Sequence, residues 1–284
     1  MLSYRHAFHA GNHADVLKHL VLVQVLRHFN QKEKPYWLVD THAGAGRYDL
    51  SGAQAAKNAE WQEGIGRLWN RDDLPPALTD YVAQVRCLNA DGRLRHYPGS
   101  PQIALQLMRE ADRLRLFELH GTDYRFLEKA IAFAGKRVAL HQADGFLEIK
   151  SVLPPPPRRG FTLMDPAFED KRDYLRTVMA AKEAMHRFPT GSCIVWYPQL
   201  QRGDARALPE KLKKLPADDW LHVALTVHAP AADGYGMHGS GLVVLNPPWT
   251  LAEQLRESMP VLVRLLGRDD AAAFVLESGS KQAP

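Results

Sequence analysis

One tetrapeptide combines an acid, a proline and an aromatic ring in the order Asp165-Pro166-Ala167-Phe168. A carboxylate and a neighbouring backbone carbonyl can accept the two N–H bonds of an adenine amino group, a poor nucleophile whose lone pair is delocalised into the ring. Pro166 restricts φ and so fixes that carbonyl, and Phe168 can stack on a base that has left its own stack. The pattern indicates methylation of an exocyclic nitrogen from a sulfonium donor, with Asp165 as the catalytic residue. The alternative is an ordinary strand exit with a buried phenylalanine.

A second segment fits the same pattern more closely, Asn246-Pro247-Pro248-Trp249. It follows the last of the predicted strands, at the expected edge of the sheet and after every candidate cofactor group. We therefore interpret it as a structural exit with a packed tryptophan.

Acidic residues end or follow three predicted strands: Glu118, Asp144 (before Gly145) and Asp165. Open α/β sheets bind ligands at the carboxyl ends of their parallel strands. Glu118 could accept hydrogen bonds from ribose hydroxyls, and Asp144 could accept one from an adenine amino group. Each could instead be a helix N-cap, but together they favour an adenosine-containing cofactor.

A glycine turn, Asp40–Gly46, follows the first predicted strand and would let the backbone approach a ligand before the next helix. A dinucleotide site usually has a third glycine three residues on, where this chain has Asp49. This weakens, without removing, the alternative of a nicotinamide-dependent oxidoreductase.

The opening segment is rich in histidine, but His13 and His19 are six residues apart and do not share a helix face, so we expect no metal site. Lys18 or His19 could meet a cofactor carboxylate, and Tyr4 a base or phosphate. Basic residues between Arg86 and Arg115 could follow a phosphate backbone or form a solvated face.

Short apolar runs predict seven strands, which are 36–40, 114–119, 137–141, 161–165, 192–197, 221–227 and 242–246. Helices are predicted from Asn12, from Ser100 (N-cap) and Pro101, and over 124–134, 174–187 and 251–266. The alternation predicts an α/β fold with a mostly parallel sheet and a C-terminal antiparallel hairpin. Residues 48–98 are expected to be an inserted helical subdomain, with 1–47 and 99–284 forming the main domain and a disordered end over 278–284.

The 284 residues are 45% hydrophobic and 24% charged with a net charge of +4, typical of a globular protein that tolerates a polyanionic partner. Two cysteines exclude a disulfide scaffold. The first residues lack the apolar core of a signal peptide, and no run could span a bilayer. We expect a cytoplasmic protein without a membrane partner, and a monomer.

Over essentially its whole length the chain resembles the 23S ribosomal RNA adenine-N6 methyltransferase family of the RlmJ type. The segments that carry the resemblance are Leu2–His6, His9–His19, Asp40–Tyr48, Tyr97–Pro101, Ala143–Phe146 and Asn246–Trp249. It implies a Rossmann-like, seven-stranded, S-adenosylmethionine-dependent fold with a helical insertion, and metal-free methylation of one adenine of 23S rRNA at N6.

The resemblance also implies cofactor contacts from His19, His42, Ser100, Glu118, Asp144, Gly145 and Asp165, catalysis by Asp165, and an RNA contact from Tyr4. The roles of His42 and Ser100 come from the resemblance alone. The family pattern at the catalytic loop is Asp-Pro-Pro-Tyr, whereas this chain has Ala167 and Phe168. Two alternatives follow from this difference or from similar loops elsewhere: a non-catalytic RNA- or cofactor-binding relative, and an adenine-N6 methyltransferase of another nucleic acid.

Overall fold

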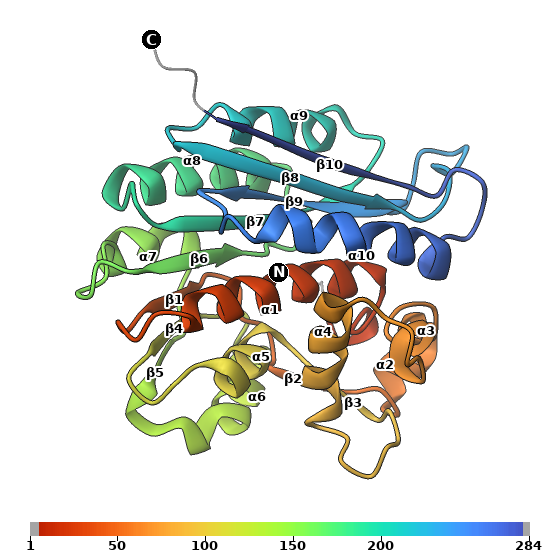
Figure 1. Ribbon diagram of the computed structural model, residues 1–284, viewed down its shortest axis with the longest axis horizontal. Helices are drawn as coiled ribbons and strands as arrows, with labels where there is room; N and C mark the ends of the chain where they lie inside the picture. Colours follow the sequence, from red (N-terminus) through yellow and green to blue (C-terminus); the bar gives the residue numbers. More distant parts are fainter. Residues whose placement is uncertain (1–5, 281–284) are drawn as a thin grey trace.

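The computed structural model describes residues 6–280, apart from the side chains of residues 53, 54 and 56, and its centre is one large sheet (Figure 1). Within that range the sheet has eight strands: β1 (Trp37–Asp40), β4 (Arg113–Phe117), β5 (Val138–His141), β6 (Gly160–Met164), β7 (Ser192–Gln199), β8 (Asp219–Thr226), β9 (Gly239–Leu245) and β10 (Ala273–Ser280). Their spatial order is β10-β8-β9-β7-β6-β1-β4-β5. The five strands from β7 to β5 are parallel, as predicted, because crossover connections return the chain to the same edge.

The C-terminal part of the sheet is antiparallel. It contains one strand that was not predicted, so the whole sheet has eight strands instead of seven. β8 and β9 form the expected antiparallel pair, but β9 lies between β7 and β8 and is antiparallel to both. β10 then pairs with β8 at the edge, so Ser278–Ser280 are strand residues and the prediction of disorder there was wrong. Most β10 side chains are exposed or half-buried, so this strand has no continuous apolar run to reveal it.

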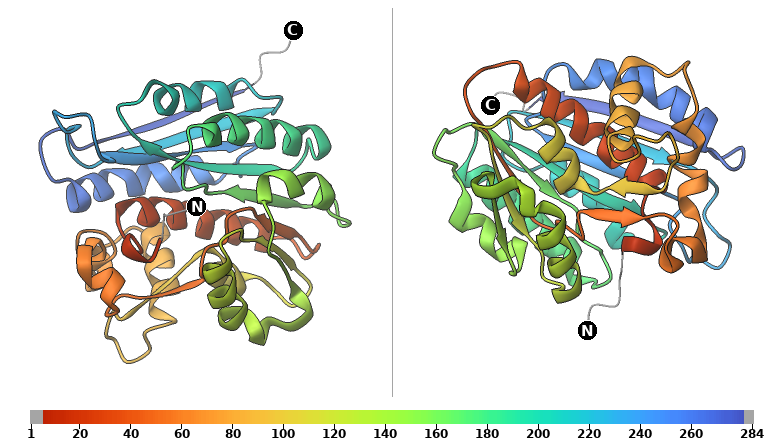
Figure 2. Two further views of the ribbon diagram at one scale, coloured as in Figure 1. Left: turned by 180° about the vertical axis from the view of Figure 1, so that it is seen from behind. Right: turned by 90° about the horizontal axis from the view of Figure 1, so that it is seen from below.

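Helices cover both faces of the sheet (Figure 2). One face packs against a layer formed by α1 (His13–Asn30), α5 (Ser100–Leu107), α6 (Gly121–Ile131) and α10 (Leu251–Leu266). The other packs against α7 (Gly145–Val152), α8 (Arg172–Arg187) and α9 (Gly203–Lys213), of which α7 and α9 were not predicted. Two 3-10 turns, η1 (His6–Phe8) and η3 (Ala132–Arg137), precede α1 and β5. The result is a three-layer sandwich.

Helix α1 is the central helix of its layer, with every residue from His13 to Leu26 buried. Asn12 caps it as predicted, because its Oδ1 accepts the backbone N–H groups of Ala14 and Asp15 at 3.0 and 3.1 Å. By contrast, the N-cap of α5 is Gly99, and Ser100 is already helical. The hydroxyl of Ser100 is therefore free to bond elsewhere.

Four short helices lie between the ribbon strands β2 (Arg47–Asp49) and β3 (His96–Pro98): α2 (Ala53–Asn58), η2 (Glu60–Glu63), α3 (Gly66–Trp69) and α4 (Pro76–Arg86). They fill the interval predicted as an insertion. Their buried residues, among them Ile65, Leu78 and Tyr81, belong to the same apolar cluster as α1. The inserted segment thus extends the main core. None of the helices in the described part of the chain is long and apolar enough to cross a membrane.

Candidate active site

A pocket of about 380 Å³ opens where β1, β4, β5 and β6 end. The loops after these four strands line it, together with α1 and the start of α5. This is the edge at which parallel α/β sheets bind ligands, since the strand ends diverge there. The volume lies in the range typical of small-molecule sites.

Asp165 follows β6 and is held by a lysine from α1. The ammonium of Lys18 lies 2.6 Å from Oδ2 of Asp165 and 2.7 Å from Oδ1 of Asp15, one turn earlier on the helix. Burial alone would lower the pKa of Lys18, but Asp15 and Asp165 raise it above its ordinary value. The lysine is therefore a permanent cation that orients the Asp165 carboxylate. Among the described residues, Oδ1 of Asp165 has no hydrogen-bond partner, and it can accept one from a substrate.

Asp15 anchors the other end of this ion pair. Its Oδ2 lies 2.9 Å from Nε2 of His6 and accepts the backbone N–H of Gly11 at 2.8 Å. Burial disfavours the Asp15 carboxylate, yet His6 and Lys18 hold its pKa well below the usual range. A chain of close polar contacts from His6 through Asp15 and Lys18 to Asp165 thus runs along the pocket wall.

Asp40 ends β1 behind the lining residues Ser100 and His42 of the pocket. It is fully buried, and it accepts hydrogen bonds from the Ser100 hydroxyl at 2.6 Å and the His42 backbone N–H at 3.2 Å. Burial raises the pKa of Asp40 to about 7, because two hydrogen bonds only partly replace its hydration. Ser100, predicted to contact a cofactor, is committed to Asp40 through its hydroxyl hydrogen.

Two histidines of the pocket are held neutral by burial. Burial lowers the pKa of His42 to about 4, and its Nδ1 lies 2.8 Å from the Thr41 hydroxyl. Burial and Lys18 lower the pKa of His19 well below its ordinary value. Nδ1 of His19 bonds the Tyr97 hydroxyl at 2.8 Å, whereas its buried Nε2 has no hydrogen-bond partner in the described chain. That orphaned nitrogen fits a polar group of a ligand.

Glu118 fastens the glycine turn after β1. Its Oε2 accepts the backbone N–H of Gly44 at 2.8 Å, and its Oε1 that of His120 at 2.7 Å. Burial nevertheless raises the pKa of Glu118. The turn has positive φ at Gly44 and Gly46, and it leads into β2 instead of the helix that the sequence had indicated. This loop therefore offers no helix N-terminus to a phosphate.

Asp144 is both a helix cap and half of an ion pair. Its Oδ1 accepts the backbone N–H of Phe146 at 3.1 Å, and its Oδ2 pairs with Arg176 of α8. Each oxygen has a further lone pair that can face a ligand. A Cβ on the next residue, Gly145, would lie 2.1 Å from the backbone oxygen of Thr41, so glycine is required there to pack α7 on the loop after β1.

Phe168 is more enclosed than a base-stacking role suggests. Only 4% of it is exposed, its φ is +52°, and its ring centre lies 4.7 Å from that of Tyr174 and 6.1 Å from that of Trp196. Trp196 also lines the pocket, and its buried Nε1 has no partner among the described residues. An incoming base would meet a cluster of rings of which Phe168 is one part.

The pocket gathers nine of the ten residues predicted for the site: Lys18, His19, His42, Ser100, Glu118, Asp144, Gly145, Asp165 and Phe168. Tyr4 lies outside the described residues. The sequence reasoning missed Asp15, Asp40, Arg176 and Trp196. Asp40 ends a strand just as Asp165 follows one, and Asp15 precedes Lys18 by one helical turn, so both had a signal. Arg176 and Trp196 had none.

The competing segment Asn246–Trp249 lies elsewhere. It follows β9, which runs antiparallel to β7, so it leaves the sheet at the edge opposite the pocket. The Asn246 amide bonds the carbonyls of Pro189 and Gly191 at 2.6 and 3.0 Å and accepts the N–H of Asp218 at 3.0 Å. Its structural role agrees with the interpretation above, but β9 is internal to the sheet, and Trp249 is 79% exposed, not packed.

No cluster of three or more histidine, cysteine, aspartate or glutamate side chains in residues 6–280 could hold a metal ion. Metal-free chemistry remains a prediction. The acceptors and donors that line the pocket instead fit an organic ligand. The lining includes the carboxylates of Glu118 and Asp144, the neutral imidazoles of His19 and His42, and the cation Lys18.

Comparison with known proteins places the chain. Residues 33–275 match the family model described as "Ribosomal RNA large subunit methyltransferase D, RlmJ". A "Ribosomal RNA large subunit methyltransferase J" from Haemophilus influenzae is 44% identical over 278 residues, covering 98% of both chains, and its namesake from Escherichia coli K12 is 45% identical over 262 residues, covering 92% of this chain and 93% of that one.

A crystal structure of a Legionella pneumophila protein superposes with a TM-score of 0.89 at 34% identity, covering 96% of this chain and 99% of that one. The arrangement of strands and helices is thus shared with an experimentally determined structure over nearly the full length. Together, the matching family model, the two relatives and the pocket at the strand ends show that the chain belongs to the RlmJ family of ribosomal RNA large subunit methyltransferases.

Proposed function

We propose that the protein transfers a methyl group to N6 of one adenine in 23S ribosomal RNA. Its relatives are rRNA large subunit methyltransferases, and S-adenosylmethionine is the methyl donor. The observation that carries the choice of atom is the Lys18–Asp165 ion pair, which leaves Oδ1 of Asp165 free in a pocket that the next residue, Pro166, also lines. This oxygen and the carbonyl of Pro166 would be the two acceptors for the two hydrogens of an exocyclic amine.

The donor supplies an electrophilic methyl group on a sulfonium. On the proposed assignment, Glu118 and Asp144 hold its adenosine, while His19, His42, Ser100 and Lys18 surround its amino-acid end. Glu118 accomplishes this while fixing the Gly44 turn, and Asp144 while capping α7. The structure around the donor is therefore preorganised by the same contacts that hold the loops in place.

Asp165 acts on the other substrate. Asp165 and the Pro166 carbonyl accept hydrogen bonds from the two N–H groups of the adenine amine, which localises the lone pair on its nitrogen. The carboxylate also stabilises the positive charge that develops on this nitrogen as the N–C bond forms and the S–C bond breaks. The methylated nitrogen then releases one proton to solvent water, and S-adenosylhomocysteine leaves. Lys18 is a positioning residue in this scheme, and Tyr4 remains a proposed RNA contact.

The test is methyl transfer from labelled S-adenosylmethionine to unmodified 23S rRNA, followed by nucleoside analysis of the product. N6-methyladenosine is expected, with an adenine-containing DNA as the comparison substrate. Label on another nucleoside, or in DNA alone, would contradict the proposed target. Binding of S-adenosylhomocysteine without any label would identify a non-catalytic relative.

A further inference from the structure

The edge of the sheet opposite the pocket is strongly basic. We call it the basic edge; it comprises Lys32, Lys34, Arg109, Arg113, Arg115, Lys136, Arg137, Arg158 and Arg159, with the acids Glu33, Glu110 and Asp112 between them. These residues precede or begin β1, β4, β5 and β6, except Arg115, which is the middle residue of β4. The surface has six net positive charges, whereas the whole chain has four, so the remainder of the protein is slightly negative.

Aromatic rings hold these guanidinium groups together. Arg159 lies 4.9 Å from the ring centre of Phe29, Arg109 5.6 Å from that of Tyr36, and Arg115 4.0 Å from that of Trp37. Burial and the neighbouring arginines lower the pKa of both Arg159 and Arg115. The fold thus concentrates like charges that repel one another, and an anion on this surface would relieve that repulsion.

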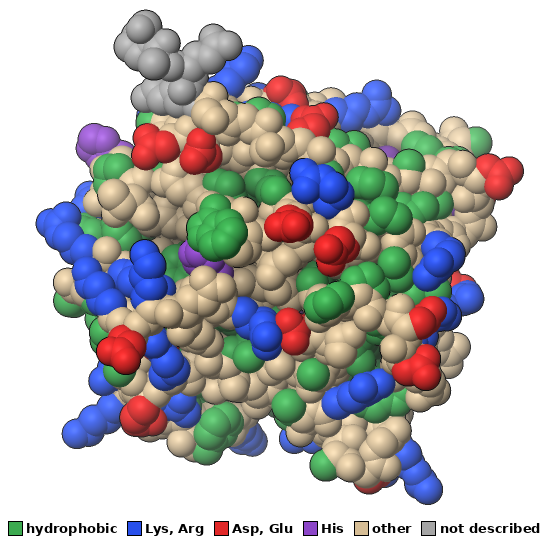
Figure 3. Space-filling model, viewed as in Figure 1, with side chains coloured by type: hydrophobic (Ala, Val, Ile, Leu, Met, Phe, Trp, Pro, Cys, Tyr) green, Lys and Arg blue, Asp and Glu red, His purple; other side chains and the backbone are tan. Residues whose placement is uncertain are grey.

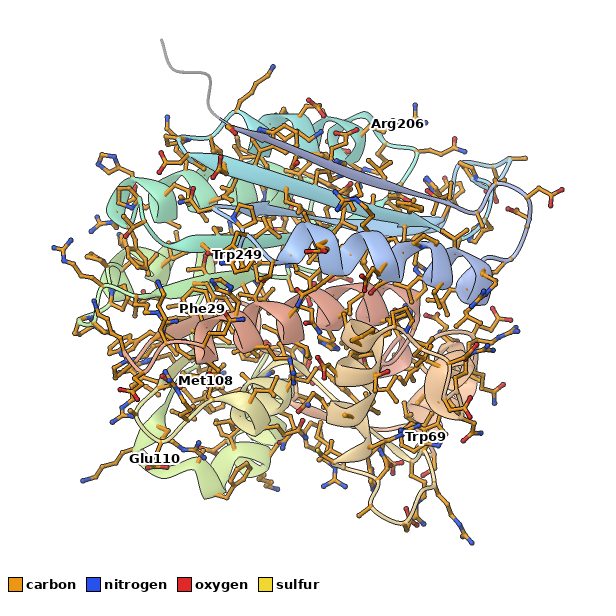
Figure 4. All side chains as sticks on the ribbon, viewed as in Figure 1. Phe29, Trp69, Met108, Glu110, Arg206 and Trp249 are labelled. Carbon is orange, nitrogen blue, oxygen red and sulfur yellow. The ribbon has the colours of Figure 1, made fainter. Side chains whose placement is uncertain are left out.

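Four of the basic side chains bond no other part of residues 6–280. Lys32, Lys34, Lys136 and Arg158 are exposed, and within residues 6–280 their side chains make no hydrogen bond or ion pair. Figure 3 shows Lys and Arg gathered along the left border of its face, where Figure 4 places Phe29, Met108 and Glu110. These cations face solvent and are available to a partner.

An exposed tryptophan lies beside them. One edge-to-face contact joins Trp249 to His28, with 6.4 Å between ring centres, and the positive charges of Arg159 and Lys32 act on His28. The loop before it is fixed by the Asn246 amide and by two prolines, so the 79% exposed ring is held at the surface (Figure 4). A rigid exposed ring next to basic side chains is the combination that binds unpaired bases and their phosphates.

We propose that the basic edge and Trp249 form a second RNA-binding surface, which grips a part of the ribosomal RNA remote from the methylated adenine. The strands that separate this surface from the pocket are four or five residues long, roughly 13–17 Å. A folded RNA can contact both edges through different segments. The inference rests on the proposed function, since it takes the partner to be the rRNA substrate.

The test compares two variants with the same loss of charge. Lys32, Lys34, Lys136 and Arg158 are all changed to Gln in the first, and Lys182, Lys211, Lys214 and Arg256, exposed on α8, α9, near the end of α9 and on α10, are changed to Gln in the control. Equilibrium binding of unmodified 23S rRNA is measured across a salt series. The first variant should bind about tenfold more weakly or worse, and its slope of log affinity against log salt should fall by about 3. The control should stay near the parent.

Trp249→Ala should weaken the same RNA binding by about tenfold, and Trp249→Phe should restore most of it, since a phenyl ring still stacks. In all variants the affinity for S-adenosylhomocysteine and the turnover at saturating RNA should match the parent, and KM for RNA should rise only in the first charge variant and in Trp249→Ala. Equal weakening in the two charge variants, or parental RNA affinity in the first, would overturn the inference. A parent that methylates no 23S rRNA would instead refute the proposed function.

Discussion

Two loops of this protein share an Asx-Pro-x-aromatic sequence and end up at opposite edges of one sheet. Asp165 follows β6, offers a carboxylate oxygen to the pocket and precedes a buried Phe168. Asn246 follows β9, donates hydrogen bonds from its amide to backbone carbonyls and precedes an exposed Trp249. Strand direction makes the difference, since β9 runs against β6 and β7. A four-residue pattern acquires its chemistry from the edge to which the strand delivers it.

We expect the largest difference between the two loops when Asp165 is changed. Asp165→Asn should lower turnover by roughly 10²–10³-fold, because the amide cannot stabilise developing positive charge as a carboxylate does. Affinity for S-adenosylhomocysteine should change little, and Lys18 would keep its contact with Asp15. Turnover is measured with saturating RNA and donor. Near-parental turnover would return Asn246–Trp249 to consideration as the catalytic loop.

At the pocket edge, the buried Asp40 makes the free energy of unfolding depend on pH. The loop Asn246–Trp249 has no counterpart to this group. The pKa of Asp40 is raised by burial to about 7 in the folded protein, against about 3.9 in an unfolded chain. Protonated Asp40 contributes favourably to the free energy of unfolding. This contribution is full below pH 4 and is lost as the pH rises toward 7, because the Asp40 carboxyl ionises more readily in the unfolded chain than in the folded protein. We expect the loss to be roughly 2–4 kcal/mol.

The measurement is the free energy of unfolding of the parent and of Asp40→Asn between pH 4 and pH 8. The difference between the two proteins isolates this one group. Asp40→Asn should lack the decline, so that its stability relative to the parent increases as the pH rises. A constant difference between the two curves would show that Asp40 titrates normally.

The sequence predicted the pocket well because its rule is local: acids at the ends of parallel strands converge at one edge, and Glu118, Asp144 and Asp165 do so. It could not predict how each group is engaged. Arg176 reaches Asp144 from α8, 32 residues later, and Phe168 is enclosed by Trp196 from the next strand. Such pairings depend on packing between elements.

The same limit explains the errors in the fold. The strand β10 carries mostly exposed side chains, so nothing apolar marks it, and the interleaving of β9 between β7 and β8 follows from pairing that no single segment encodes. The basic residues from Arg86 to Arg115 were predicted as one group. They divide between α4, the β3 ribbon and the basic edge, because the chain turns through the insertion between them.

At the other loop, Asn246→Ala should reduce stability by roughly 2–3 kcal/mol, since the carbonyls of Pro189 and Gly191 lose their donor and alanine tolerates the φ of +48° poorly. Asn246→Gly removes the amide without the backbone strain, so it should be intermediate. Denaturant unfolding gives both values. Affinity for S-adenosylhomocysteine should match the parent in each. A change in that affinity would mean that the two edges are coupled.

The smallest effect is expected at Ala167, where this chain departs from the Asp-Pro-Pro-Tyr pattern. Ala167 is exposed at the mouth of the pocket, and among the described residues its N–H makes no hydrogen bond. Proline there deletes no native bond, and it reduces the freedom of the unfolded chain. Ala167→Pro should therefore leave turnover equal or slightly higher and raise stability by less than about 1 kcal/mol. A severalfold loss of turnover, with cofactor affinity retained, would show that the left-handed turn at Phe168 needs the flexibility of alanine before it.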